Sequence, residues 1–243
     1  MTPDERLKNI QWEEFLSKSI SASSIGEWWF CQALITNEKL FGEIETPETI
    51  EGSKLHEEEA SEIIEALGPL EEVKVDSLFD AMIHSRRNIE NALRNREVLA
   101  NSDDTILFRA ICPEIGYVGT PDEVDCSDGR DPIVVELKTT GNRPWKPWTN
   151  HEAQIGAYML GMERLGFHQS YGRLRYRVRD SDAPITEFIV NMDDRLRNLV
   201  LSSARSIISI LSGSDPEPTR NVNKCRSCKY SQLCQWSLSR SPD

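Results

Sequence analysis

Long hydrophobic runs are missing from this sequence. No stretch approaches the roughly 20 apolar residues that a bilayer-spanning helix needs, and the N-terminal residues lack a basic segment followed by an apolar one. We therefore expect no membrane association, no secretion and a cytoplasmic location. Glycine, with 13 residues, and proline, with 12, are too scarce for a collagen-like or low-complexity chain. The 243 residues, 38% apolar and 28% charged, predict a soluble globular protein.

Positive charge is also scarce, since the net charge is -12, and such a balance normally argues against a nucleic-acid partner. The excess is concentrated in residues 38–74, where twelve acids face three lysines and leave a net charge of -9. The rest of the chain is nearly balanced. A polyanion responds to the field within a Debye length of about 8–10 Å. The composition therefore leaves room for a basic, nucleic-acid-binding patch elsewhere.

Cysteines are few, and three of the six lie together in the C-terminal tail with the spacing C-x2-C-x5-C; they are Cys225, Cys228 and Cys234. In a reducing compartment such a cluster indicates a metal site more often than disulfides. A closed tetrahedral site needs a fourth thiolate, and Cys31 is the natural candidate. Four thiolates suit either Zn²⁺ or an iron-sulfur cluster, and the spacing leaves both open. Taken alone, Cys31 is a small buried apolar residue, the role that we assign to Cys112 and Cys126.

Periodicity and turn signals predict helices first, strands in the middle and a last helix before the tail. We expect a capping box at Ser24–Glu27 ahead of residues 28–35, a helix over 51–67 stopped by Gly68-Pro69, and a longer helix over 76–98. Strands over 105–112, 117–126 and 133–138 form a predicted three-strand meander. A helix over 149–165, strands over 171–179 and 186–190, and a helix from an Asp193 N-cap to Leu211 complete the prediction.

This order predicts a mixed α/β sheet with helices against it, plus a helical elaboration built from both chain ends. We expect three parts along the chain: a helical N-terminal part over 1–100, a core sheet and helix over 101–192, and a C-terminal helix with the cysteine cluster over 193–243.

Two acids and a lysine are expected to meet where two strands pair. The turn over 127–129 makes its flanking strands a hairpin, and pairing about Gly129 places Asp122 opposite Glu136. Directly opposed Cβ atoms lie about 4.5–5.5 Å apart, so the two carboxylates can hold one divalent cation. Lys138, two residues beyond Glu136, projects to the same side of the strand. Oxygen ligands for Mg²⁺ or Mn²⁺ beside a cationic group suit metal-assisted phosphodiester hydrolysis.

The alternative is a structural role for these side chains. Asp122 follows a proline, which is ordinary turn chemistry and by itself favours that alternative. Glu136 is harder to explain in this way, because it interrupts the apolar run 133–137, where an acid seldom lies without a partner. The same register puts Asp125 on the side of Val135, which suggests a bulge or a strong twist.

Four short motifs follow one another along the chain: Gly52-Ser53-Lys54-Leu55-His56, Gly119-Thr120-Pro121-Asp122, Glu136-Leu137-Lys138, and Gln154 with Tyr158 four residues later. In this order they resemble the motifs of RecB-type nucleases in the PD-(D/E)xK superfamily. The resemblance implies a restriction-endonuclease-like fold, a mixed sheet flanked by helices. It implies an Mg²⁺ or Mn²⁺ site formed by His56, Asp122, Glu136 and the Leu137 carbonyl. Lys138 then acts on the attacking water, and Gln154 and Tyr158 position the lysine or contact nucleic acid.

Each motif is weak by itself: His56 alone is a helix-face histidine, and Gln154 and Tyr158 alone are an ordinary amphipathic face. One early cysteine plus a C-terminal C-x2-C-x5-C around such a core is similar to the iron-sulfur nucleases. The short chain best resembles the CRISPR-associated exonucleases of the fourth Cas family. That resemblance implies a [4Fe-4S] cluster on Cys31, Cys225, Cys228 and Cys234, and the trimming of DNA ends for spacer integration.

Basic and aromatic side chains gather in two places. Residues 173–179 alternate so that one face of a strand carries four arginines, which indicates either a phosphate track or a solvated edge strand guarded by charge. Trp145 and Trp148 lie among Arg143 and Lys146 just after the Glu136 strand, as platforms for unpaired bases or as loop anchors.

The sequence thus predicts an Mg²⁺- or Mn²⁺-dependent DNA exonuclease acting on single strands or DNA ends, with a [4Fe-4S] cluster and CRISPR integrase proteins as candidate partners. A DNA-repair iron-sulfur exonuclease unrelated to CRISPR is one alternative. The other is a zinc-stapled nucleic-acid-binding protein without activity.

Overall fold

The strands of the computed structural model, which describes residues 3–68, 74–179, 181 and 183–239, form two sheets. The larger sheet has five strands in the order β1-β4-β5-β6-β7. Strands β5 and β6 are parallel, and all other neighbouring strands of this sheet are antiparallel. Its strands are β1 (Val98–Ala100), β4 (Glu123–Asp125), β5 (Ile133–Thr140), β6 (Tyr171–Val178) and β7 (Thr186–Asn191). The second sheet is the hairpin of β2 (Ala110–Cys112) and β3 (Tyr117–Gly119), joined by a 3-10 turn, η1 (Pro113–Ile115).

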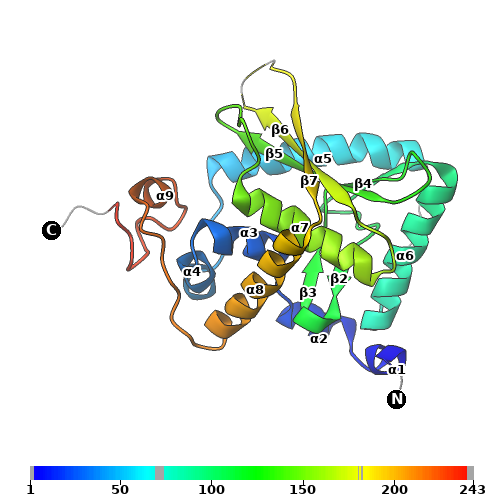
Figure 1. Ribbon diagram of the computed structural model, residues 1–243, viewed down its shortest axis with the longest axis horizontal. Helices are drawn as coiled ribbons and strands as arrows, with labels where there is room; N and C mark the ends of the chain where they lie inside the picture. The colour runs from blue at the N-terminus through cyan, green and yellow to red at the C-terminus, as the bar shows by residue number, and fades with distance from the viewer. Residues whose placement is uncertain (1–2, 69–73, 180, 182, 240–243) are drawn as a thin grey trace.

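Helices lie on both sides of the larger sheet (Figure 1). They are α1 (Pro3–Lys8), α2 (Trp12–Lys18), α3 (Ala22–Phe30), α4 (Ala33–Phe41), α5 (Pro47–Leu67), α6 (Leu78–Asn95), α7 (Thr149–Arg164), α8 (Asp194–Leu211) and α9 (Val222–Arg226). The predicted mixed α/β sheet flanked by helices is confirmed. In the described part of the chain, no helix is long and apolar enough to cross a membrane.

The predicted three-strand meander is wrong, because the chain changes sheets twice. Residues 105–109 form no strand, since their backbone groups bond to side chains: Asn101 Oδ1 accepts from the N–H of Leu107 and Phe108, and Ser85 Oγ accepts from that of Arg109. The predicted strand over 117–126 breaks at Pro121, whose nitrogen carries no hydrogen for a ladder bond. Its two halves are β3 and β4, which belong to different sheets.

Helix ends follow local hydrogen bonding more closely than apolar periodicity. The Ser24 capping box is wrong, since Ser21 is the N-cap of α3 and accepts from the Ser24 N–H. Helix α5 begins four residues before the predicted start, because Thr46 and Thr49 form a reciprocal capping box there. It ends at Leu67 as predicted, with Gly68 as its C-cap; Pro69 lies outside the described residues. The predicted helix over 76–98 ends earlier, because Arg96 adopts a left-handed backbone and β1 follows. The Asp193 N-cap of α8 is confirmed.

Helix α7 is the centre of the core. Its residues Ala153–Met162 are all buried, because the sheet, the β2–β3 hairpin, α3 and α8 surround it. Two tryptophans of α3 reach α8 across the sequence: Trp28 Nε1 donates to Ser206 Oγ at 3.0 Å, and Trp29 Nε1 to Ser203 Oγ at 2.8 Å. Segments from the first and last thirds of the chain therefore hold α7 against the sheet (Figure 1).

Candidate active site

The pairing of β4 with β5 brings two acids together. The observed pairs, from Glu123 with Val135 to Asp125 with Ile133, have the predicted register, and the prediction is confirmed. One residue beyond the ladder, Asp122 Oδ2 accepts a hydrogen bond from the Leu137 N–H at 2.7 Å. This bond fixes the Asp122 carboxylate against the strand that carries Glu136. Of the two alternatives, a bulge or a strong twist, the bulge is wrong, because the ladder is regular through Asp125.

Glu136 is the most deeply buried acid of the site, with 2% of its surface exposed. Its Oε1 accepts from Lys138 Nζ and from Gln154 Nε2, both at 2.7 Å. Its Oε2 is buried and has no hydrogen-bond partner among the described residues. Burial raises the pKa of Glu136 to about 7, and the nearby charge of Asp122 adds to the rise.

His56 of α5 forms a hydrogen bond with the other oxygen of the Asp122 carboxylate, with 3.1 Å between His56 Nδ1 and Asp122 Oδ1. Burial alone would lower the pKa of His56, but the hydrogen bond and charge of Asp122 outweigh it and the pKa is raised. Burial alone would raise the pKa of Asp122, but the bond to His56 and the charge of Lys138 hold it below its ordinary value. When His56 is protonated, the two side chains form an ion pair that is about three-quarters shielded from solvent.

Lys138 is the cation of this site. Burial by itself would lower its pKa, but the charges of Glu136 and Asp122 raise it, so the ammonium form is favoured. Gln154 and Tyr158 lie one turn apart on α7, and Gln154 Nε2 also donates to the Tyr158 hydroxyl at 3.1 Å. The structure thus brings the predicted residues together: hydrogen bonds link Glu136, Lys138, Gln154 and Tyr158, and Asp122 accepts from the N–H of Leu137, the residue after Glu136.

Two residues near the Asp122 motif were not predicted from the sequence. Asn101 bonds through its side chain to the carbonyls of Phe108 and Pro121, and its own N–H donates to the Asp122 carbonyl at 3.0 Å. Tyr117 lies on β3 with its ring over Gly119, so that a Cβ at position 119 would meet the Tyr117 hydroxyl at 2.2 Å. A side chain at 119 would displace the tyrosine, which explains the glycine of that motif. An asparagine directly after a short apolar strand is the only sequence signal for Asn101.

The donor set is compatible with a hard divalent cation. Carboxylate oxygens with one imidazole nitrogen suit Mg²⁺ or Mn²⁺, and the unpartnered Glu136 Oε2 is a buried acceptor that needs a cation or donor. As the side chains stand, no group of three or more His, Cys, Asp or Glu residues in the described ranges is placed to hold one metal ion. Asp122 contacts His56 directly, and Glu136 contacts Lys138.

A cleft opens beside Asp122 and His56. It is lined by His56 and Asp122 together with Glu57, Asp103 and other residues of the loops over 101–106 and 120–121. Glu57 ties α5 to this loop, because its carboxylate accepts from the Asp103 N–H at 3.1 Å. The cleft gives a solvent-side approach to the ion pair.

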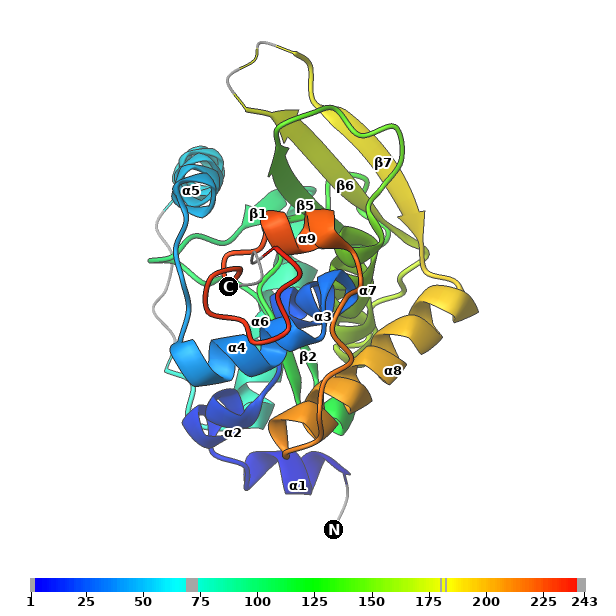
Figure 2. The ribbon, with the colours of Figure 1, turned by 90° about the vertical axis from the view of Figure 1, so that its left-hand side faces the viewer.

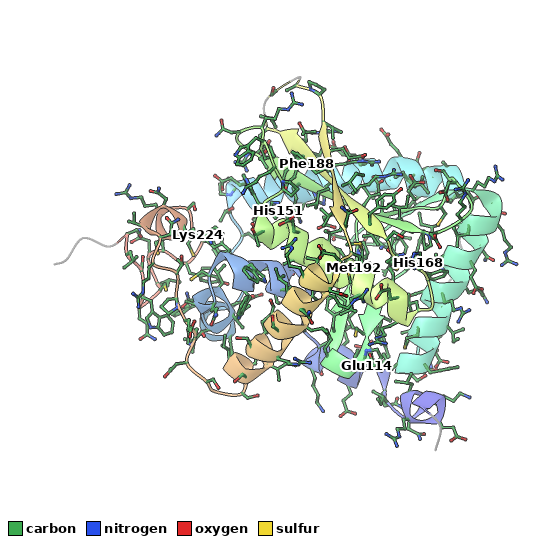
Figure 3. The ribbon with its side chains drawn as sticks, in the orientation of Figure 1. Glu114, His151, His168, Phe188, Met192 and Lys224 are labelled. Carbon is green, nitrogen blue, oxygen red and sulfur yellow. The ribbon has the colours of Figure 1, made fainter. Side chains whose placement is uncertain are left out.

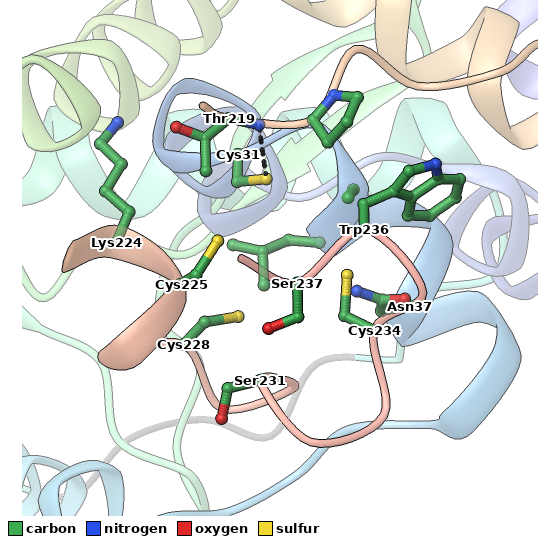
Figure 4. Close-up of a pocket in the computed structure, with 13 residues that line it drawn as sticks. Cys31, Asn37, Thr219, Lys224, Cys225, Cys228, Ser231, Cys234, Trp236 and Ser237 are labelled. Carbon is green, nitrogen blue, oxygen red and sulfur yellow. Dashed lines mark hydrogen bonds between the residues drawn. The ribbon is translucent and has the colours of Figure 1, made fainter. Parts of the chain in front are cut away.

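The four predicted cluster cysteines line one pocket, although the first is far from the others in sequence (Figure 4). Cys31, Cys225, Cys228 and Cys234 are free thiols there, and the Cys31 sulfur accepts from the Thr219 N–H at 3.3 Å. The tail is held beside α3 and α4 by other bonds as well: Lys224 Nζ donates to the Phe30 carbonyl at 2.9 Å, and Figure 2 shows α9 next to these helices. Cys112 and Cys126 are buried elsewhere, as expected.

The arginine strand differs from both predicted roles. Strand β6 is not an edge strand, because it pairs with β5 and with β7. Three of the four arginines are already neutralised: Arg173 pairs with Asp125 at 2.8 Å, Arg175 with Glu123 at 2.9 Å and Glu187 at 3.0 Å, and Arg177 with Glu59 of α5. The fourth, Arg179, lies just beyond the end of β6. The repulsion that would have favoured a polyanion is therefore relieved within the chain, and the phosphate track loses its premise.

A family model of the PD-(D/E)XK nuclease superfamily matches residues 16–235. The chain belongs to this superfamily. One solved structure, titled "Crystal structure of SSO0001", is similar over 93% of this chain and 92% of its own, with 18% sequence identity and a TM-score of 0.53. At that identity the likeness shows the fold alone. No curated protein matches the chain.

Divalent cations should stabilise the folded protein through Asp122. Mn²⁺ at a hundredfold excess over its Kd adds about 2.7 kcal/mol to the free energy of unfolding, which thermal denaturation with and without EDTA will measure. Asp122→Asn should abolish most of the Mn²⁺-induced shift, whereas the control Asp125→Asn should retain it, because Asp125 faces Arg173. An equal shift in both variants would place the cation elsewhere.

Proposed function

We propose that this protein is a cytoplasmic, Mg²⁺- or Mn²⁺-dependent DNA exonuclease that degrades single strands from their ends. The observation that supports it best is the joined pair of Asp122, fixed by the Leu137 N–H, and buried Glu136 with one unpartnered oxygen. Superfamily membership supports nuclease chemistry on this pair. The exposed part of the site, formed by Asp122 and His56, faces the open cleft through which a strand would enter.

A cation bound by Asp122, Glu136, His56 and the Leu137 carbonyl would polarise the scissile phosphate and lower the pKa of a bound water. Lys138 acts from the side of Glu136, where its favoured ammonium form donates hydrogen bonds and stabilises negative charge that develops on phosphate. Gln154 holds Glu136 Oε1 and Tyr158 holds Gln154, so these two residues orient the acid and the lysine. Asn101 fixes the backbone that presents Asp122.

The proposal includes a [4Fe-4S] cluster bound by the four pocket cysteines. It is supported by their convergence on one pocket as free thiols. No three of these thiols in the described ranges are placed to hold one metal ion, so the choice of an iron-sulfur cluster over Zn²⁺ rests on the resemblance of the cysteine spacing. Such a cluster would join α3 to the C-terminal tail. The resemblance to CRISPR-associated exonucleases supports a role in trimming DNA ends for integrase proteins, with general DNA repair as the alternative.

Nuclease activity should require a divalent cation and the three central residues. Glu136→Ala, Asp122→Ala and Lys138→Ala should each reduce the rate of single-strand degradation by about 10²–10³-fold or more. Excess Mn²⁺ should partly rescue the carboxylate variants only, because Lys138→Ala still binds cation and DNA but is slow in the chemical step. The control Asp125→Asn should keep its activity. Full activity in all three alanine variants would show that these residues are structural, whereas a wild-type protein without activity would favour the non-catalytic binding protein.

Anaerobically purified protein should be brown and contain about four irons per chain. Cys31→Ser and Cys228→Ser should both lose iron and lower the melting temperature, while Cys126→Ser, which changes a buried thiol outside the pocket, should keep its iron. Iron, sulfide and zinc analysis will measure this. Colourless protein with stoichiometric zinc would overturn the cluster and leave the nuclease proposal standing.

A further inference from the structure

The loop between β5 and α7, residues 141–148, holds the most exposed of the large apolar side chains in the described part of the chain. Trp145 is 83% exposed, and its only ring contact there is with its neighbour Lys146, whose Nζ lies 4.8 Å from the ring centroid. Other tryptophans are packed, as in Trp12 against Phe15 and Trp28 against Trp29. An indole left in water forfeits the burial of some 150–250 Å² of surface, so its position needs an explanation.

The loop that carries Trp145 is anchored on both sides of it. Pro144 is buried. Trp148 packs on Tyr176 and on His151, with ring centroids 6.0 and 5.2 Å apart, and its backbone N–H donates to the Tyr176 hydroxyl at 3.2 Å. His151 lies in the first turn of α7 (Figure 3). Of the two tryptophans predicted as base platforms or loop anchors, Trp148 is therefore an anchor. Trp145 is held outward by a fixed loop.

The anchor also places the loop next to the catalytic lysine. Tyr176 of β6 is the registered partner of Lys138 in β5, so the aromatic cluster under the loop borders the chemical site. His151 belongs to the same cluster, and its pKa is lowered to about 3. Burial is the larger cause, and the positive charge of Lys138 is the second. A strand whose phosphate lies at Lys138 would thus pass close to the base of this loop.

The charges around Trp145 select the class of ligand. Arg143 and Lys146 are exposed on either side of it in the sequence, in a protein whose net charge is -12. An anionic backbone beside a flat apolar ring is the chemistry of a nucleic-acid strand. In a duplex the faces of the bases are covered by their neighbours, so only an unstacked, unpaired base offers its face to Trp145.

We propose that Trp145 is a stacking platform for one unpaired nucleobase of the substrate strand, next to the nucleotide whose phosphate is cleaved, with Arg143 and Lys146 on the flanking phosphates. This inference rests on the proposed nuclease function and deepens it, because it names the side chains that would select an unpaired base beside the cleavage site. Stacking of this kind changes affinity by roughly 5- to 150-fold per base.

The test combines a protein change with a DNA change. Binding of single-stranded oligonucleotides, with Ca²⁺ in place of Mg²⁺, is measured for the wild-type protein, Trp145→Ala and Trp145→Phe, with an abasic nucleotide moved stepwise along the strand. We expect Trp145→Ala to weaken binding 5- to 150-fold and Trp145→Phe much less. One abasic position should weaken the wild type by a similar factor and Trp145→Ala hardly at all. Leu40→Ala, which removes another exposed apolar side chain, should bind like the wild type.

Wild-type affinity for DNA in Trp145→Ala would overturn the proposal. So would additive losses of binding free energy from Trp145→Ala and from every abasic position, because they would mean that Trp145 stacks on none of these bases. Loss of association with a protein, without any effect on DNA, would also overturn it and mark the loop as a protein contact. Because Trp145 is exposed, its substitution should leave the stability of the fold unchanged. Equal melting temperatures of the variants and the wild-type protein will verify this. Coupling at one base in a protein that cleaves nothing would sustain the platform while rejecting the nuclease proposal.

Discussion

The antiparallel register of β4 and β5 is the constraint on which the site depends. It brings Asp122 next to Glu136, and the bond from the Leu137 N–H holds the aspartate there. A shift of one residue would turn Glu136 to the other face of the sheet, away from Gln154. The surrounding structure serves this register: Asn101 holds the backbone before β4, and the buried helix α7 presents Gln154 over β5.

The two faces of the sheet separate its charges. The face toward α7 carries Glu136 and Lys138 and keeps an unsatisfied acceptor, whereas the opposite face carries arginines that are each matched by an acid. Part of the acidic segment over 38–74, whose residues 69–73 lie outside the described ranges, has this structural purpose: Glu59 neutralises Arg177 and Glu57 binds the backbone of the cleft loop. Part of the acidic excess of this segment is thus offset by cations elsewhere in the chain, whereas Arg143 and Lys146 of the loop over 141–148 form no ion pair with a described residue.

Local signals in the sequence predicted α7, α8 with its Asp193 cap, and the hairpin register that places Asp122 beside Glu136, because each depends on neighbours a few positions away. His56, Gln154 and Tyr158 came from the resemblance alone, and the roles of the site residues stay predictions. The errors arose where distant groups decide. Side chains of Ser85 and Asn101 satisfy the backbone of residues 105–109 and prevent a strand, and Glu59 is 118 positions from the Arg177 that it neutralises. No pattern in one sequence reports such partners. The division into three parts stays a prediction. One apolar cluster contains buried residues from all three parts, from Ile20 to Ile210.

The most direct test of the account is a crystal of the protein soaked in Mn²⁺ and measured at a wavelength where manganese scatters anomalously. The account predicts an anomalous peak bounded by carboxylate oxygens of Asp122 and Glu136, with the His56 ring turned to it and the Asp122–Leu137 bond kept. A peak confined to the neighbouring acids Glu57 and Asp103, with the Asp122 and Glu136 contacts unchanged, would contradict the claim that the β4–β5 register builds the catalytic metal site.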